Sequence, residues 1–203
     1  MNRNIAIGIV LVGVFIAGIA GYYVSTGRQA EKLPAIGNEE APETAAVEPV
    51  PEFSLADING TMRQLSDWQG KARLVNFWAT WCAPCRREIP LLKKTQKEQA
   101  VNNIQVIGIA VDYPEEVQAY AEEAQFNYPI LVGQEDAMAA AEASGIDFIG
   151  MPFTMIIAPS GALLKTHIGE IVEAHIKKII EVFDGLESGR LDLAGARAAL
   201  EKL

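Results

Sequence analysis

The apolar positions after residue 50 follow the periods of short strands that alternate with helices. Strands are expected where apolar residues alternate or run together for about four to eight residues, and helices where they recur every three or four positions. The expected strands cover residues 53–57, 61–65, 74–77, 104–111, 128–132, 153–158 and 162–167. The expected helices cover residues 82–99, 114–125, 136–143 and 172–183. This order predicts an α/β fold, a mixed β-sheet flanked by helices, with an N-terminal β-hairpin that turns at Asn59-Gly60.

A different pattern precedes this body, because the run from Ile5 to Val24 is uncharged and mostly apolar. A helix needs roughly 20 apolar residues to cross a bilayer. We therefore expect residues 1–28 to form an N-terminal signal anchor with one transmembrane helix. The alternative is a cleavable signal peptide, whose apolar core is about 7–15 residues long, with Gly18-Ile19-Ala20 as the cleavage site. The basic residues on the two sides of the run nearly balance, so they do not decide the orientation in the membrane. A short N-terminal flank usually stays in the cytoplasm, which would place the rest of the chain outside.

Composition divides the rest of the chain into three parts. Residues 29–50 are rich in Glu, Ala and Pro and have little to bury, which predicts a flexible acidic linker. Residues 51–184 have the length and apolar content of one ordinary domain. Residues 185–203 are rich in Leu and Ala and are expected to form a helical tail. Its leucines should pack on the domain: Leu191, Leu193, Leu200 and Leu203.

Charge and metal-ligand content exclude several classes of function. The formal net charge is −9 and no basic run is present, which argues against a nucleic acid partner. The chain has two cysteines and two histidines. A structural zinc site needs four ligands, and His167 and His175 are far from the cysteines in sequence. We therefore expect no bound metal.

The two cysteines stand in the stretch Trp81-Cys82-Ala83-Pro84-Cys85, directly after an apolar strand. This order places Cys82 at the N-terminus of a helix, where free N–H groups and the helix dipole favour a thiolate. Cys85 lies three residues further on the same helix face. Cys82 is therefore the expected nucleophile and more exposed thiol, and Cys85 the resolving thiol. Dithiol–disulfide exchange through a redox-active Cys82–Cys85 disulfide requires no separate cofactor.

The residues around this motif resemble those of the membrane-anchored TlpA/ResA-like thiol–disulfide oxidoreductases of the thioredoxin-like superfamily. The resemblance lies in residues 75–88, Pro90, Gly150-Met151-Pro152 and Ser160-Gly161, and it spans roughly residues 50 to 184. It implies a thioredoxin-like fold for the mixed sheet. One departure is Phe153, where many relatives have a small polar residue, and this bears on the substrate groove.

The resemblance also implies roles for residues outside the cysteine pair. Met151-Pro152 should form a cis peptide bond that faces the cysteines and exposes the Met151 backbone to an extended substrate. Trp81 is expected to form an apolar lip for substrate or to serve in packing. In the family a glutamate at the position of Glu88 tunes the acidity of the cysteines. The alternative is a solvated glutamate paired with an arginine such as Arg87.

The expected function is that of a thiol:disulfide oxidoreductase, most simply a reductase, because no basic residue stands between the cysteines to stabilise the reduced form. The resemblance implies cysteine pairs of exported proteins as substrates, in apocytochrome c or copper-site assembly proteins. It implies a membrane electron donor of the cytochrome-biogenesis type and a monomeric body facing the periplasm from the bacterial inner membrane. One alternative is a copper-delivery chaperone that uses Cys82, Cys85 and Met151 or His167. A peroxidase is a further alternative, but it would need a threonine or serine three residues before Cys82, where Ala79 stands.

Overall fold

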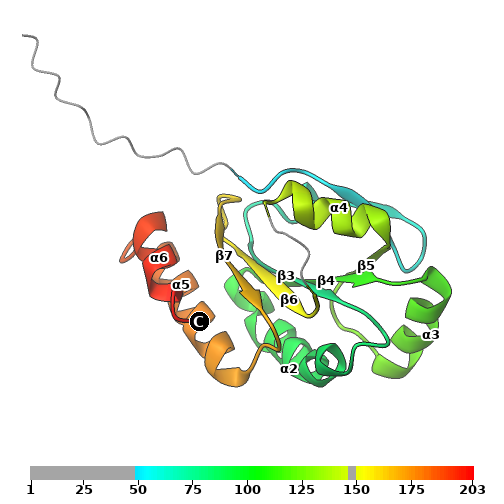
Figure 1. The fold of residues 1–203 in the computed structure, drawn as a ribbon. Coiled ribbons are helices and arrows are strands. Elements are labelled where there is room, and N and C mark those ends of the chain that lie inside the picture. Colours follow the sequence, from blue (N-terminus) through cyan, green and yellow to red (C-terminus); the bar gives the residue numbers. More distant parts are fainter. Residues whose placement is uncertain (1–48, 146–149) are drawn as a thin grey trace, which may run out of the picture. The chain divides into compact units, whose positions relative to one another are not determined.

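A seven-stranded mixed sheet organises the residues that this computed structural model describes, namely 49–145 and 150–203 (Figure 1). In spatial order its strands are β2 (Met62–Gln64), β1 (Ser54–Asp57), β5 (Ile130–Gly133), β4 (Ile104–Val111), β3 (Ala72–Trp78), β6 (Phe153–Ile157) and β7 (Leu163–Ile168). Strands β3, β4 and β5 are parallel, whereas the remaining neighbours pair antiparallel. The β1–β2 pair is the predicted N-terminal hairpin, and the mixed sheet is confirmed.

Helices cover both faces of this sheet (Figure 1). The helices and 3₁₀ turns are η1 (Leu65–Trp68), α2 (Ala83–Gln99), η2 (Ala100–Asn102), α3 (Pro114–Ala124), α4 (Glu135–Ala143), α5 (Glu173–Glu187) and α6 (Leu193–Leu200). Apolar residues of α2, α3, α5 and α6 belong to one core cluster, and those of α4 and η1 to another. The sheet therefore separates two hydrophobic cores, as Figure 1 shows for α4 above it and α2 below it.

The alternation of side chains along β3 explains why both cores form. Leu74 and Trp78 belong to the cluster on the α2 side, whereas Val75 and Phe77 belong to the cluster on the α4 side. Successive residues of a strand point to opposite faces, so a strand buried on both sides is apolar throughout. Arg73 and Asn76 are the exceptions in β3. Asn76 is fully buried and lies on the α2 face by the same alternation.

Two residues before the predicted domain boundary at residue 51 contact the body. Pro49 forms an isolated bridge with Ala162, and the Val50 N–H donates to the Gly161 carbonyl at 2.9 Å. Val50 also packs against the core cluster on the α4 side. The last two residues assigned to the linker therefore contact the turn between β6 and β7.

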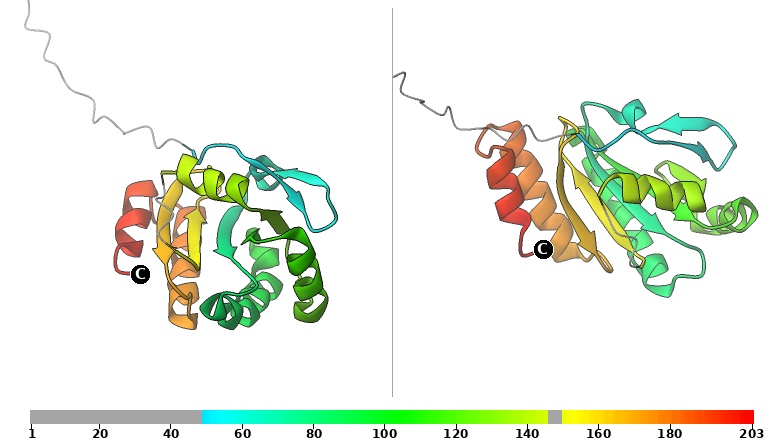
Figure 2. Two further views of the ribbon diagram at one scale, coloured as in Figure 1. Left: turned by 45° about the vertical axis from the view of Figure 1, so that its right-hand side comes forward. Right: turned by 45° about the horizontal axis from the view of Figure 1, so that its top comes forward.

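Helix α5 continues past the predicted boundary at residue 184 and ends at Glu187. Gly185 lies inside the helix, and a Cβ atom there would lie 2.6 Å from the Leu191 side chain. The absence of a side chain at Gly185 thus allows the tail to fold back. Helix α6 packs against α5 and β7 (Figure 2), with Leu200 fully buried, as expected for a helical tail packed on the domain.

The predicted anchor at residues 1–28 and most of the predicted linker lie outside the described residues. Within residues 49–145 and 150–203, no helix has the length and apolar character needed to cross a bilayer.

Candidate functional site

Cys82 and Cys85 lie where the chain passes from β3 into α2, and a disulfide joins them. Cys82 is the N-cap residue of α2, and its sulfur accepts a hydrogen bond from the Cys85 N–H at 3.3 Å. Pro84 stands in the first turn, where its missing N–H costs no helical hydrogen bond. Cys82 is 5% exposed and Cys85 0%, so Cys82 is the more exposed cysteine. The start of the helix would stabilise a thiolate on Cys82 after reduction.

The turn that carries Trp81 is fastened by Asp112, which directly follows the neighbouring strand β4. Asp112 Oδ2 accepts hydrogen bonds from the Thr80 N–H at 3.0 Å and from the Thr80 hydroxyl at 2.6 Å. Its Oδ1 accepts from the Tyr113 N–H at 2.9 Å. Since β3 and β4 are parallel neighbours, their carboxyl ends meet at this edge of the sheet. Trp81 is 69% exposed, which fits the expected apolar lip beside the cysteines.

The Met151–Pro152 peptide bond is cis, as the resemblance implies. Strand β6 starts at the next residue and pairs antiparallel with the end of β3, so the cis bond lies at the same sheet edge as the cysteines. Met151 packs against the core cluster that contains both cysteines. Phe153 stacks on Phe77 with ring centroids 4.3 Å apart, in the core on the α4 side. The difference from relatives at Phe153 therefore affects core packing on the α4 side of the sheet, whereas the cysteines belong to the core on the α2 side.

Glu88 is buried on α2, three residues after the second cysteine. Its Oε1 accepts from Asn76 Nδ2 at 2.7 Å, and its Oε2 accepts from the Ile171 N–H at 2.6 Å. Burial outweighs both donors and raises the pKa of Glu88 to about 7. The alternative of a solvated glutamate paired with Arg87 is wrong, because Arg87 donates to Glu170 instead. A carboxyl group with this pKa exchanges its proton near neutral pH.

Asn76 and Thr154 complete the surroundings of Glu88 and were not predicted as site residues. Asn76 Nδ2 also donates to Thr154 Oγ1 at 3.0 Å, whereas Asn76 Oδ1 is buried without a hydrogen-bond partner among the described residues. A half-turn of the amide would direct that acceptor toward Glu88, which becomes a donor when it is protonated. The signal in the sequence was the polar Asn76 inside the otherwise apolar run of residues 74–78.

His167 and His175 pack together, with ring centroids 4.4 Å apart. His167 is buried, which lowers its pKa, and its Nε2 lies 3.4 Å from the Glu170 backbone oxygen. These contacts give His167 a packing role between β7 and α5. In the part of the chain that the structure describes, no three His, Cys, Asp or Glu side chains gather as they would around a metal ion.

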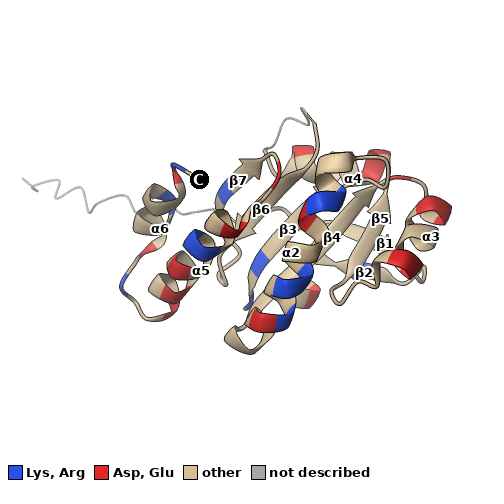
Figure 3. Cartoon of the chain, turned by 90° about the horizontal axis from the view of Figure 1, so that it is seen from below, with Lys and Arg blue, Asp and Glu red and all other residues tan. Residues whose placement is uncertain are grey.

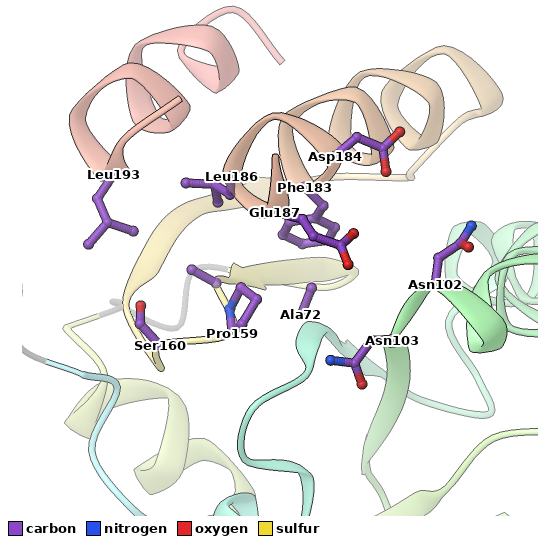
Figure 4. Close-up of a pocket in the computed structure, with 11 residues that line it drawn as sticks. Ala72, Asn102, Asn103, Pro159, Ser160, Phe183, Asp184, Leu186, Glu187 and Leu193 are labelled. Atoms are coloured by element: carbon purple, nitrogen blue, oxygen red, sulfur yellow. The ribbon is translucent and has the colours of Figure 1, made fainter. Parts of the chain in front are cut away.

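A pocket of about 410 Å³ lies beside the start of β3, between this strand and α5 (Figure 4). Ala72 at the start of β3, Pro159 in the β6–β7 turn and Phe183 near the end of α5 line it. Because the cysteines follow the other end of β3, this pocket is not part of the disulfide site.

Comparisons with known proteins agree with this geometry. The model of the AhpC/TSA family matches residues 47–165. Thioredoxin-like protein YneN of Bacillus subtilis is 28% identical over 176 residues, which are 85% of this chain and 96% of that protein. Thiol-disulfide oxidoreductase ResA of Geobacillus thermodenitrificans is 30% identical over 132 residues, which are 64% of this chain and 74% of that protein.

A solved structure shows the same fold. The thiol:disulfide interchange protein of the thioredoxin family from Chlorobium tepidum superposes with a TM-score of 0.60 at 32% identity. The match covers 66% of this chain and 93% of that one. Together with the disulfide at the start of α2, these matches show that the chain belongs to the AhpC/TSA family and is a thiol–disulfide oxidoreductase of thioredoxin-like fold.

Proposed function

We propose that this oxidoreductase works as a reductase of disulfides in exported proteins. The observation that carries the proposal is the Cys82–Cys85 disulfide at the start of α2, with Glu88 buried three residues further along the same helix. Burial raises the pKa of Glu88 to about 7, which suits a group that accepts and returns a proton at neutral pH. Glu88 and Cys85 are three residues apart on α2 and are both buried, so they share one helix face. The dipeptide Ala83-Pro84 between the cysteines adds no positive charge that would favour a strong oxidant.

The proposed reaction has two exchange steps. The Cys82 thiolate attacks one sulfur of the substrate disulfide, which forms a mixed disulfide and releases the other substrate sulfur as a thiolate. Cys85 then loses its proton to Glu88 and attacks the Cys82 sulfur. This step breaks the mixed disulfide, releases the second substrate thiolate and closes the Cys82–Cys85 bond. The substrate gains two electrons, its thiolates take up protons from Glu88 and water, and a donor dithiol must reduce the enzyme again.

The substrate and partners in this proposal follow from the family resemblance. Cysteine pairs of apocytochrome c or of copper-site assembly proteins are the proposed substrates, and a membrane carrier of the cytochrome-biogenesis type is the proposed electron donor. The body would act as a monomer in the periplasm, held at the bacterial inner membrane by residues 1–28. The exposed Trp81 and the cis bond before Pro152 support a surface that receives an extended segment of a protein substrate.

Equilibration of the full-length protein with a dithiothreitol or glutathione couple tests the direction of the reaction. We expect a potential nearer the thioredoxin value of about −270 mV than the value of about −120 mV typical of a strong oxidant. The reduced protein should also cleave the interchain disulfides of insulin with turnover when dithiothreitol is supplied. A potential near about −120 mV would contradict the reductase assignment.

Two experiments in cells test location and substrate. The chain contains two cysteines, both in the active site, so a membrane-impermeant maleimide reports their side of the membrane directly. Labelling of the reduced protein in spheroplasts supports a periplasmic body, and labelling only after lysis contradicts it. A Cys85→Ser variant should accumulate mixed disulfides through Cys82, whose partners identify the substrates. Recovery of only cytosolic proteins would refute the proposed class.

A further inference from the structure

The loop of residues 169–172, between β7 and α5, contacts several parts of the active site. The Gly169 N–H donates to the carbonyl of Pro152, the residue after the cis bond, at 2.8 Å. Glu170 Oε2 accepts from Arg87 Nε at 3.0 Å. The Ile171 N–H donates to Glu88 Oε2 at 2.6 Å. A loop without regular structure has few other constraints on where its N–H groups point, so these contacts decide the position of the Ile171 donor.

Two adjacent residues of α2 hold two adjacent residues of this loop. On the outside Arg87 pairs with Glu170, and their side chains are 61% and 30% exposed. On the inside the buried Glu88 accepts from the Ile171 backbone. An exposed ion pair contributes little to stability by itself. Here, however, Nε and one terminal nitrogen of Arg87 both donate to Glu170 Oε2, and two charge-assisted hydrogen bonds from one rigid guanidinium group restrict the position of that oxygen.

We propose that Glu170, held by Arg87, is a positioning residue that keeps the Ile171 N–H on Glu88 and thereby sets the charge state of Glu88. The consequence for catalysis rests on the proposed role of Glu88 as the proton acceptor for Cys85. The chemical basis is that a backbone donor stabilises the ionised carboxyl group only while it remains within hydrogen-bond distance.

The groups that face Glu88 allow this effect to be separated from simple charge effects. Asn76 on β3 is a neutral donor. Burial raises the pKa of Tyr128, before β5, far above its ordinary value, so Tyr128 stays neutral. On α2 the oxidised cysteines do not titrate, and Arg87 is positive. Glu170 is the negative neighbour, and its repulsion raises the pKa of Glu88.

Two variants of Glu170 distinguish position from charge. Glu170→Gln removes the negative charge but keeps an oxygen that accepts from Arg87, whereas Glu170→Ala removes both. If only charge matters, the two variants lower the pKa of Glu88 equally. If Glu170 positions the loop, Glu170→Ala frees the Ile171 N–H, and the pKa of Glu88 becomes higher in Glu170→Ala than in Glu170→Gln, by about 0.5 to 1 unit.

The measurement uses the oxidised full-length protein with ¹³C-labelled glutamate carboxyl groups, titrated by NMR, together with hydrogen exchange of the Ile171 amide. We expect faster Ile171 exchange in Glu170→Ala only. The matched control is Glu173→Ala, because Glu173 at the start of α5 pairs with Lys94 of α2 at 3.5 Å, and no hydrogen bond or ion pair joins it to Glu88 among the described residues. This control should leave both readouts at the wild-type values. Figure 3 shows basic and acidic residues on both of these helices.

Equal pKa values of Glu88 in the two Glu170 variants, or unchanged Ile171 protection in Glu170→Ala, would overturn the proposal. The proposed function has a separate readout, the pH profile of thiol alkylation in the reduced protein. If the NMR results agree with the proposal but the pH profile of thiol alkylation does not follow the protonation of Glu88, the positioning is correct and the catalytic role of Glu88 is refuted.

Discussion

Glu88 is expected to make the stability of the folded body depend on pH. Burial raises the pKa of Glu88 from the ordinary value of 4.5 to about 7, so the fold favours the protonated carboxyl group. The difference of about 2.5 pKa units, at about 1.4 kcal/mol for each unit, corresponds to about 3 kcal/mol in the free energy of unfolding. This stability is fully present below pH 4.5, where Glu88 is protonated in both states, and is lost as the pH rises through about 7.

The variant Glu88→Gln tests this linkage because glutamine cannot ionise and keeps the shape of the protonated side chain. Its Nε2 can donate to Asn76 once the Asn76 amide turns its unpartnered oxygen inward. Between about pH 4 and about pH 8, the free energy of unfolding of the variant should rise by about 3 kcal/mol relative to wild type. Urea denaturation of the oxidised protein, followed by tryptophan fluorescence, measures it, since all three tryptophans lie in the described body.

Glu98→Gln is the matched control for this experiment. Glu98 lies on the same helix but is exposed, so its substitution should leave the pH dependence of unfolding as in wild type. If the unfolding free energies of wild type and Glu88→Gln run parallel across this pH range, Glu88 ionises equally well in the folded and unfolded states and the reasoning from burial is refuted.

Three further predictions concern the remaining parts of the site. Cys82→Ser should abolish insulin reduction, while Cys85→Ser should form mixed disulfides without turnover, and multiple turnovers by either variant would refute the assigned order of attack. Trp81→Ala should lower kcat/KM for protein disulfides about fivefold, as expected for a contact of about 1 kcal/mol, and leave a small disulfide reagent unaffected; equal losses on both would contradict a role in protein binding. Asp112→Ala removes the acceptor of three hydrogen bonds and should cost about 3 kcal/mol in urea denaturation, so an unchanged midpoint would show that this carboxyl group does not hold the Thr80 turn.

Local signals in the sequence were sufficient for the strands, most helices and the cysteine pair. The apolar run before Cys82 predicted a buried strand, and β3 extends that strand from residues 74–77 to Ala72–Trp78. The strands predicted at residues 153–158 and 162–167 are likewise formed, as the antiparallel pair β6 and β7. The segment predicted as a strand from Tyr128 enters the sheet only at Ile130, although Tyr128 is buried. Burial alone does not decide whether a residue joins the hydrogen-bonded ladder.

Contacts between distant residues could not be predicted in the same way. The donor to Glu88 is the backbone of Ile171, 83 residues away, and the acceptor for Thr80 is Asp112, 32 residues away. Neither pair has a local pattern, because a backbone N–H carries no sequence signature and an aspartate after a strand has many possible partners. The same applies to Pro49, whose bridge to Ala162 extends the body beyond the compositional boundary.

The mixed order of the sheet explains why these distant contacts meet at one site. Strands β3 and β4 are parallel, so both end at the edge where Cys82 and Asp112 lie. Strand β6 is antiparallel to β3, so its beginning, after Pro152, lies at the same edge, and β7 returns there with the loop that holds Glu88. A C-x-x-C motif at the start of a helix provides the two sulfurs, with Trp81 and Glu88 close to them in the chain. The cis bond, the Asp112 carboxyl group and the Ile171 N–H come from distant segments that this strand order brings to the same site. We therefore expect substitutions in the β7–α5 loop to change thiol chemistry without touching a cysteine.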